Sequence, residues 1–399
     1  MAKYDLQPVY LTEQESKFIA SKQLLSFLFV RGTASRPREG RARAPSKALF
    51  SFGVLPLNSF TESPPFFNWK SRPIYDVDGL LLFRDHTLKL DSNNEIQVRT
   101  GASDLLRTPV WSVRAGRAWD IDGLVEKALK VIKETADLEP ILVDHEKTVR
   151  LICYGYPRLG ILCRSHKRRT RKFVMDLWDL VLIPVGPADQ NAPPESVKTI
   201  WSPYDWVGRP TLSHFRSRFK QNLESLPELS ETLKDLPDAI EAAQADIIEE
   251  LTTNPEIKLI GQQTDFFCAP ATAKMILEQH GISKSQDEIA DAMQTLPTGT
   301  TPEDQKEAIL GLTDWRFDGL LDTSTSFSEA KDEIRENRPF KAGTATHARA
   351  CGGFKVEQDG REWLYLYDPL PSNVGTIYYE NWEADYYLDY MYVRPALYS

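Results

Sequence analysis

The chain has 399 residues, of which 41% are hydrophobic and 26% are charged, a composition typical of a globular protein with two or three domains. Its net charge of −9 argues against a general binder of nucleic acids or other polyanions. No stretch approaches the roughly 20 apolar residues that cross a bilayer, and the four cysteines do not suggest a disulfide framework.

The apolar run nearest the N-terminus, Leu24–Val30, does not have the character of a secretory leader. It is short, and the segment before it contains the acidic residues Asp5, Glu13 and Glu15. We therefore expect a protein that is cytoplasmic as synthesised. Export by an apparatus that needs no leader stays open, because it would leave no mark in the sequence.

Residues 1–185 are predicted to form an N-terminal domain of mixed α and β structure, and no motif indicates its role. A hairpin is predicted to turn at Asp78-Gly79, and an amphipathic helix is predicted over Ile121–Lys133. Cys153 and Cys163 lie in apolar surroundings that favour two buried strands joined by a turn. We interpret both thiols as core residues.

Two clusters of basic residues depart from the acidic average. They contain Arg31, Arg36, Arg38, Arg41, Arg43 and Lys47 in the first, and Arg164, Lys167, Arg168, Arg169, Arg171 and Lys172 in the second. Each could contact phosphate or anionic lipid, but neither is interleaved with stacking aromatic residues or accompanied by a known nucleic-acid motif. We therefore expect solvated surface and no nucleic-acid partner.

Residues 186–257 are predicted to be a proline-rich linker followed by a helical connector. Prolines gather at its start, at 187, 193 and 194. Helices are predicted over Leu212–Leu223 and over Pro237–Leu251. Residues 258–399 then form a third predicted unit, which carries the residues with chemical potential.

Cys268 stands where the apolar stretch 266–270 turns into an amphipathic helix that continues to His280 and stops at Gly281. Unpaired N–H groups and the positive end of the helix dipole favour the thiolate of a cysteine at a helix start, and the thiolate is the reactive species. The alternative is a cysteine that only fills space in the core.

A nucleophilic thiol needs a base, usually a histidine, and an orienting group for that base. Of the six histidines, only His280 and His347 follow Cys268. His280 would sit about 18 Å away along the same helix, which leaves His347. Small residues surround His347 in two predicted strands, and such neighbours leave room for a substrate backbone.

Asp368 is the candidate orienting group. The predicted strand over Trp363–Tyr367 ends at Asp368, and a turn at 358–360 would bring that strand back beside the one that follows His347. The carboxylate could then fix the imidazole tautomer. A plain turn start at Asp368-Pro369 is the alternative.

Three capping signatures predict helices between the thiol and the histidine, beginning at Ser285, Thr301 and Ser326. Aromatic and β-branched residues predict further strands at 375–379 and 387–393. Helices followed by an antiparallel sheet give an α+β fold for this unit.

These positions together resemble the papain-like cysteine peptidases, over residues 258–399 only. The resemblance is closest to compact bacterial members, such as the peptidases that process bacteriocin leaders and papain-like effector proteases. It implies that Cys268 is the nucleophile, His347 the general base and acid, and Asp368 the orienting group. It further implies that Gln262 donates to the oxyanion beside the N–H of Cys268, although the adjacent Gln263 could be the donor instead.

The resemblance implies hydrolysis of peptide bonds in a protein or peptide substrate, without a cofactor. No metal is expected, because Cys351 has no paired Cys-x-x-Cys motif or second clustered histidine around it. Three alternatives stay open: transfer of the acyl group to an amine by the same triad, an inactive scaffold whose N-terminal module binds a partner, and autoinhibition by the N-terminal region as a pro-segment.

Overall fold

A computed structural model gives the structure of the chain. It describes residues 8–28, 69–89, 95–116, 120–135, 141–143, 149–165, 172–185, 209–224, 247–297, 299–344, 346–384 and 389–396. The first basic cluster, most of the second, the linker prolines at 187, 193 and 194, and residues 237–246 of the predicted helix over 237–251 lie outside these residues. None of the helices in the described ranges combines the length and the apolar composition needed to cross a bilayer.

The described residues contain seven helices and sixteen strands. The helices are α1 (Glu13–Leu28), α2 (Ile121–Thr135), α3 (Arg209–Glu224), α5 (Cys268–Gln279), α6 (Gln286–Ala292), α7 (Pro302–Leu312) and α8 (Phe327–Arg335). The strands of the N-terminal half are β1 (Lys70–Tyr75), β2 (Leu81–Lys89), β3 (Glu95–Gly101), β4 (Val110–Gly116), β5 (Ile141–Val143), β6 (Leu151–Gly155), β7 (Arg158–Ser165), β8 (Lys172–Asp176) and β9 (Leu182–Val185). Those of the C-terminal half are β10 (Ile247–Thr252), β11 (Phe317–Asp322), β12 (Phe340–Gly343), β13 (Ala348–Glu357), β14 (Glu362–Asp368), β15 (Thr376–Asn381) and β16 (Asp389–Pro395).

One continuous sheet runs through both halves of the chain. Its order is β11-β16-β12-β13-β14-β15-β4-β3-β2-β1-β6-β7-β8-β9, with β10 beside β13 and β5 beside β7. The pairs are antiparallel except for the parallel pair of β1 and β6. This agrees with the predicted α+β class, whereas the division at residues 185 and 257 stays a prediction.

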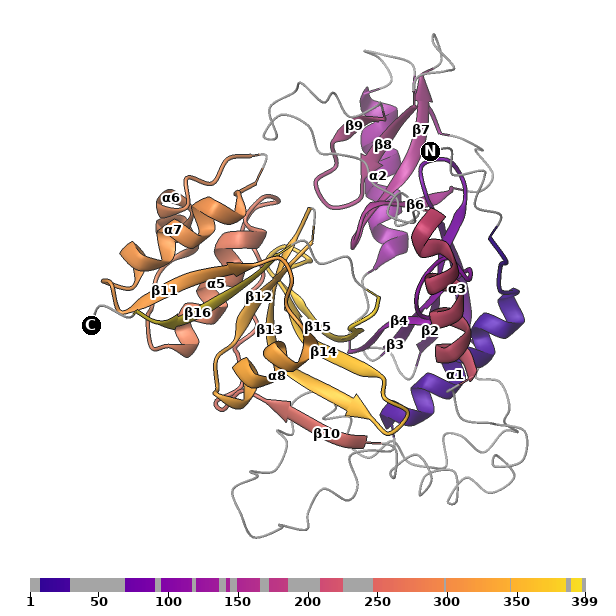
Figure 1. Cartoon of the computed structure of the whole chain (residues 1–399). Coiled ribbons are helices and arrows are strands. Elements are labelled where there is room, and N and C mark those ends of the chain that lie inside the picture. The colour runs from indigo at the N-terminus through magenta and orange to yellow at the C-terminus, as the bar shows by residue number, and fades with distance from the viewer. Residues whose placement is uncertain are drawn as a thin grey trace.

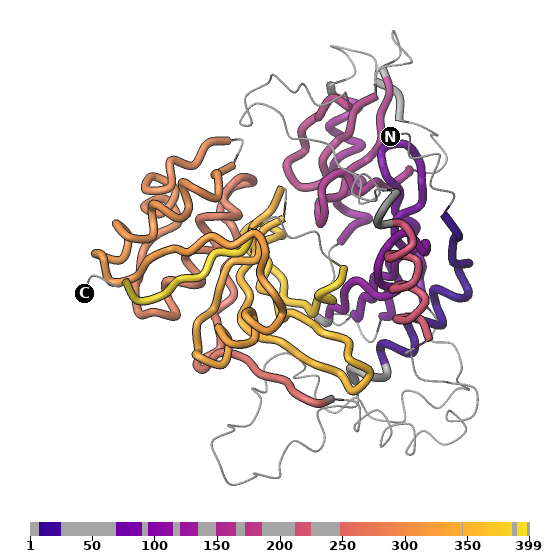
Figure 2. Tube along the Cα trace, in the orientation of Figure 1, coloured from indigo at the N-terminus to yellow at the C-terminus, as the bar shows by residue number. Residues whose placement is uncertain are grey.

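The two halves meet where β15 pairs with β4 (Figure 1). Tyr378 lies opposite Arg114 and Tyr379 opposite Val113 in this register. In Figure 2 the indigo-to-magenta tube of the N-terminal half and the orange-to-yellow tube of the C-terminal half lie on opposite sides of this junction. One hydrophobic core includes buried residues of both halves, such as Val113 and Tyr379, so the halves share interior as well as hydrogen bonds.

Local signals in the sequence explain where the C-terminal helices begin. Ser285 and Ser326 each form a complete capping box with the glutamate three residues later. The side chain of Thr301 accepts a hydrogen bond from the N–H of Asp304, and a proline follows Thr301 in the first helical turn. Each cap satisfies N–H groups that a helix start leaves without a partner, and such a cap is worth about 1 kcal/mol. The three predicted helix starts are confirmed.

The predicted hairpins and strands are also found. β1 and β2 pair around Gly79, and β13 and β14 pair around Gly360. Both glycines have a positive φ, which a residue without Cβ adopts freely. Cys153 and Cys163 are buried on the paired strands β6 and β7.

The prediction of a helix over 237–251 is wrong for its described part. Ile247–Thr252 forms strand β10, which pairs antiparallel with β13 from Glu357 to Gly353. The β-branched residues Ile247, Ile248 and Thr252 suit a strand, and an available sheet partner overrides a weak helical preference. β11, between α7 and α8, also interrupts the predicted order of helices first and sheet second.

Candidate active site

Cys268 is the first residue of α5, which packs against β12 and β13. Buried residues on α5, including Ala273, Ile276 and Leu277, fix the helix against the sheet. Phe267 precedes the helix, and its side chain accepts no hydrogen bond from the first backbone N–H groups of α5. Cys268 is half-buried, at a helix start that has no side-chain cap.

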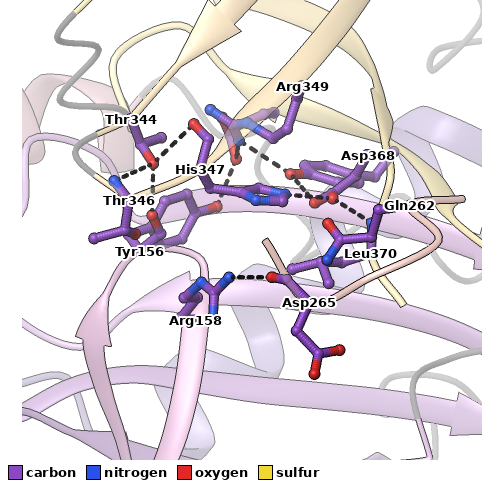
Figure 3. Close-up of polar contacts among 12 residues, drawn as sticks. Tyr156, Arg158, Gln262, Asp265, Thr344, Thr346, His347, Arg349, Asp368 and Leu370 are labelled. Atoms are coloured by element: carbon purple, nitrogen blue, oxygen red, sulfur yellow. Dashed lines mark hydrogen bonds and ion pairs between the residues drawn. The ribbon is translucent and has the colours of Figure 1, made fainter. Parts of the chain in front are cut away.

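His347 lies in the connection between β12 and β13, and its side chain is fully buried. Its Nε2 is 2.7 Å from Oδ1 of Asp368 (Figure 3). The other ring nitrogen, Nδ1, makes no hydrogen bond of standard geometry within the described residues. His347 and Cys268 are nevertheless close enough for each to change the pKa of the other.

The electrostatics of the thiol favour its ionised form. Burial raises the pKa of Cys268, but hydrogen bonding and charge from His347, the charge of Arg158 and the N–H of Ala348 outweigh burial. The result is a thiol pKa lowered to about 7. Near neutral pH a substantial fraction of Cys268 is therefore thiolate.

The histidine shifts in the opposite direction. Burial lowers the pKa of His347, whereas the charge and hydrogen bond of Asp368 and the neighbouring Cys268 raise it, and the net pKa is raised. A thiol that is easier to ionise beside an imidazole that is harder to deprotonate favours a thiolate–imidazolium pair.

Asp368 is the last residue of β14 and is completely buried. Its Oδ1 accepts from the N–H of Leu370 at 2.9 Å as well as from His347, and its Oδ2 accepts from the hydroxyl of Tyr378 at 3.2 Å. Burial raises the pKa of Asp368, but His347, Arg349 and the Leu370 N–H lower it by more than burial raises it. The pKa of Asp368 is therefore lowered overall. The carboxylate is thus ionised and held in one orientation.

Gln262 and Gln263 have different surroundings. Gln262 is completely buried, and its N–H donates to the carbonyl of Pro369 at 3.0 Å, which joins the loop before Cys268 to the segment after Asp368. Its Nε2 donates to the carbonyl of Thr264 at 2.8 Å. The side chain of Gln263 is exposed.

The comparison with protein families gives a match over this part of the chain. Residues 255–394 match the model of the Peptidase_C39 like family. The C-terminal part is a papain-like cysteine peptidase domain. Its activity class is that of a cysteine-type hydrolase, and the family indicates a protein substrate.

Two solved structures are similar to part of the chain. The peptidase domain of Streptococcus ComA, a bi-functional ABC transporter involved in a quorum sensing pathway, is 17% identical over 35% of this chain and 99% of that one, with a TM-score of 0.28. UfSP from C. elegans is 14% identical over 37% of this chain and 34% of that one, with a TM-score of 0.29. No curated protein matches the chain.

Two other cysteines, one in the N-terminal half and one inside the peptidase domain, differ from Cys268. Cys153 and Cys351 are completely buried, and burial raises the pKa of each to about 12. Both remain neutral thiols, as expected of core residues. Within the described ranges no three or more His, Cys, Asp or Glu residues gather in a way that could hold a metal ion.

Several residues beside the peptidase site carry no signal in the sequence. Arg158 and Tyr156 belong to the N-terminal half, and Arg349, Tyr378 and Glu380 lie on strands of the C-terminal sheet. All five are buried. A buried arginine or glutamate on a strand looks like any surface residue in the sequence, because only the tertiary fold decides which strand faces it.

Proposed function

We propose that the peptidase domain hydrolyses peptide bonds with Cys268 as nucleophile, His347 as general base and acid, and Asp368 as the group that orients His347. The observation that carries this proposal is the position of the imidazole. Its Nε2 lies on the Asp368 carboxylate, and the ring influences the Cys268 thiol, whose pKa is lowered to about 7.

In the first half of the reaction, the Cys268 thiolate attacks the carbonyl carbon of the scissile peptide bond. A tetrahedral intermediate forms, and its oxygen carries the negative charge. His347 in its protonated form gives its proton to the leaving nitrogen as the C–N bond breaks. The amine product leaves, and an acyl group remains bound to the sulfur as a thioester.

Two N–H donors are proposed for the oxyanion. One is the backbone N–H of Cys268 at the start of α5, where Phe267 supplies no side-chain cap. The other is Nε2 of Gln262, which carries two hydrogens, of which one points to the Thr264 carbonyl. That carbonyl also favours the orientation with nitrogen rather than oxygen towards it. Burial of Gln262 and exposure of Gln263 support Gln262 as the donor.

In the second half, neutral His347 accepts a proton from water, and the resulting hydroxide adds to the thioester carbonyl. The acid product leaves and the Cys268 thiolate is restored, with His347 protonated again. Asp368 stabilises the imidazolium in both halves through its charge and hydrogen bond.

Incubation of the full chain with a peptide library tests the proposal, with new N-termini identified by mass spectrometry. We expect cleavage by the wild type and by Cys351→Ala, the matched thiol control, and no cleavage by Cys268→Ala. Cleavage that survives in Cys268→Ala would refute the assignment. A parallel incubation with an added primary amine distinguishes the reaction from transamidation, since an amide product would replace the free acid.

A further inference from the structure

The tip of the β6–β7 hairpin, which belongs to the N-terminal half, contacts both loops of the peptidase site. The hydroxyl of Thr344 donates to the carbonyl of Tyr156 at 2.9 Å (Figure 3). The hydroxyl of Thr346 donates to the carbonyl of Gly155 at 3.2 Å. Both threonines lie in the loop that carries His347. The hairpin therefore fixes this loop from outside the peptidase domain.

Arg158 is the first residue of β7 and reaches the second loop. Its Nη2 donates to the backbone carbonyl of Asp265 at 3.2 Å (Figure 3). Asp265 precedes Cys268 by three residues, in the turn that leads into α5. The guanidinium thus fixes the backbone immediately ahead of the nucleophile.

The charge of Arg158 is buried and paired on its other side. The residue is 3% exposed, and its Nη1 lies 2.6 Å from Asp179 and 3.4 Å from Asp176. A buried charge is tolerated only when it is paired and hydrogen-bonded. The two carboxylates meet this need at Nη1, while Nη2 extends to the loop of the nucleophile and Nε has no hydrogen-bond partner within the described residues.

The contact between the hairpin and the His347 loop leaves no space for a side chain at position 155. A Cβ on Gly155 would lie 2.8 Å from Cγ2 of Thr346. At such a distance either the Thr346 side chain or one of the two segments must shift. The close approach depends on glycine here, so the hairpin and the loop are fitted to one another.

The hairpin is also linked to Asp368 through buried side chains. The hydroxyl of Tyr156 donates to Glu380 at 2.6 Å, and Glu380 pairs with Arg349 at 2.7 Å. Arg349 donates to the hydroxyl of Tyr378, which donates in turn to Asp368. One turn of the N-terminal half thus contacts the segments of Cys268 and His347 directly and is linked to Asp368 through three intervening side chains.

We propose that Arg158 is a positioning residue of the peptidase site: it fixes the loop that leads into Cys268 and places a permanent positive charge beside the thiol. This inference rests on the proposed function. It makes the N-terminal half a permanent part of the active site, in contrast to a pro-segment that must be removed before the enzyme is active.

Among the described residues, the strongest charges that act on Cys268 are those of His347 and Arg158. The titratable groups near Arg158 include Tyr154, Asp176, Asp179 and Asp265. Arg158 is the only cation of the N-terminal half in this set. A test that removes its charge should therefore change the ionisation of the thiol directly.

Alkylation of Cys268 by iodoacetamide, followed between pH 5 and 9 by peptide mass spectrometry on the full chain, measures thiolate formation without a substrate. The main variant is Arg158→Gln with Asp179→Asn, which removes the cation together with one buried partner charge. We expect its alkylation at pH 6 to fall about tenfold, since an opposite charge at close range changes a pKa by about 1 or more. Asp179→Asn alone is the matched control and retains the rapid reaction at pH 6.

Arg158→Lys is the second variant, to be used if thermal melting shows that the main variant does not fold. It keeps the charge, so its alkylation at pH 6 should stay within about threefold of wild type. A wild-type profile in a folded main variant, or a tenfold loss in Arg158→Lys, overturns the inference. Faster alkylation in the main variant also overturns it, because the hairpin would then be a barrier. Wild-type Cys268 that does not react at pH 6 even with Arg158 present contradicts the proposed function instead.

Discussion

His347 and Asp368 form a pair that is fully removed from solvent, with 2.7 Å between Nε2 and Oδ1. The carboxylate keeps the proton on Nε2, so Nδ1 is the ring nitrogen left to exchange a proton. Cys268 contributes to the raised pKa of His347. The pair itself joins two neighbouring strand ends, since β13 begins immediately after His347 and β14 ends at Asp368. Its geometry therefore depends on the sheet.

Asp368→Asn should lower kcat/KM for peptide hydrolysis by about 100-fold or more, because an amide neither stabilises the imidazolium nor enforces the same tautomer. Tyr378→Phe is the matched control, since it removes one hydrogen bond to Oδ2 and leaves the charge. We expect it to lose less than about tenfold. Equal losses in the two variants would show that the site depends on packing around Asp368 and not on its charge.

The pH dependence should differ between alkylation and hydrolysis. Below the Cys268 pKa of about 7 the thiol is protonated, so both rates should fall about tenfold for each pH unit. At higher pH alkylation should reach a plateau, whereas hydrolysis should fall again when His347 loses the proton that the leaving amine needs. Because the pKa of His347 is raised from 6.5, that fall begins above 6.5. Measured rates for both reactions between pH 5 and 10 check this, and a plateau in hydrolysis would contradict the acid role.

Gln262→Ala should reduce kcat by about 100-fold, which is the usual cost of one oxyanion donor, and should leave KM nearly unchanged. Gln263→Ala is the neighbouring control and should keep wild-type kinetics, because its side chain is exposed. Steady-state kinetics on the same peptide separates the two. Thermal melting is needed for Gln262→Ala, whose side chain is buried. A larger loss in Gln263→Ala would transfer the assignment to that residue.

Residues 247–399 alone should be less stable than the full chain and prone to aggregate. Their separation would expose the β15 edge that now pairs with β4, together with the buried Tyr378 and Tyr379. An unpaired strand edge readily pairs with another copy. Thermal melting and size-exclusion chromatography of the fragment and the full chain check this. A monomeric fragment with an unchanged melting temperature would show that the N-terminal half does not support the fold of the peptidase domain.

The sequence by itself determined the local parts of this site. Capping residues at Ser285, Thr301 and Ser326 start helices because they satisfy N–H groups within three residues of themselves. Turns at 76–80 and 358–360 bring adjacent strands together in the same way. Such signals act over a few residues, so they can be recognised from the sequence without knowledge of the fold. The thiol at a helix start and the carboxylate at a strand end follow from these elements.

Only the tertiary structure decided what depends on distant partners. Residues 247–252 form a strand because they pair with β13. The residues next to 247–252 in the sequence do not indicate that this partner is present. Burial separates Gln262 from Gln263, although the two are chemically identical. Arg158 reaches the loop of Cys268 because pairing of β4 with β15 joins the two halves in one sheet. Strand partners and burial are properties of the whole chain, since each depends on where every other element packs.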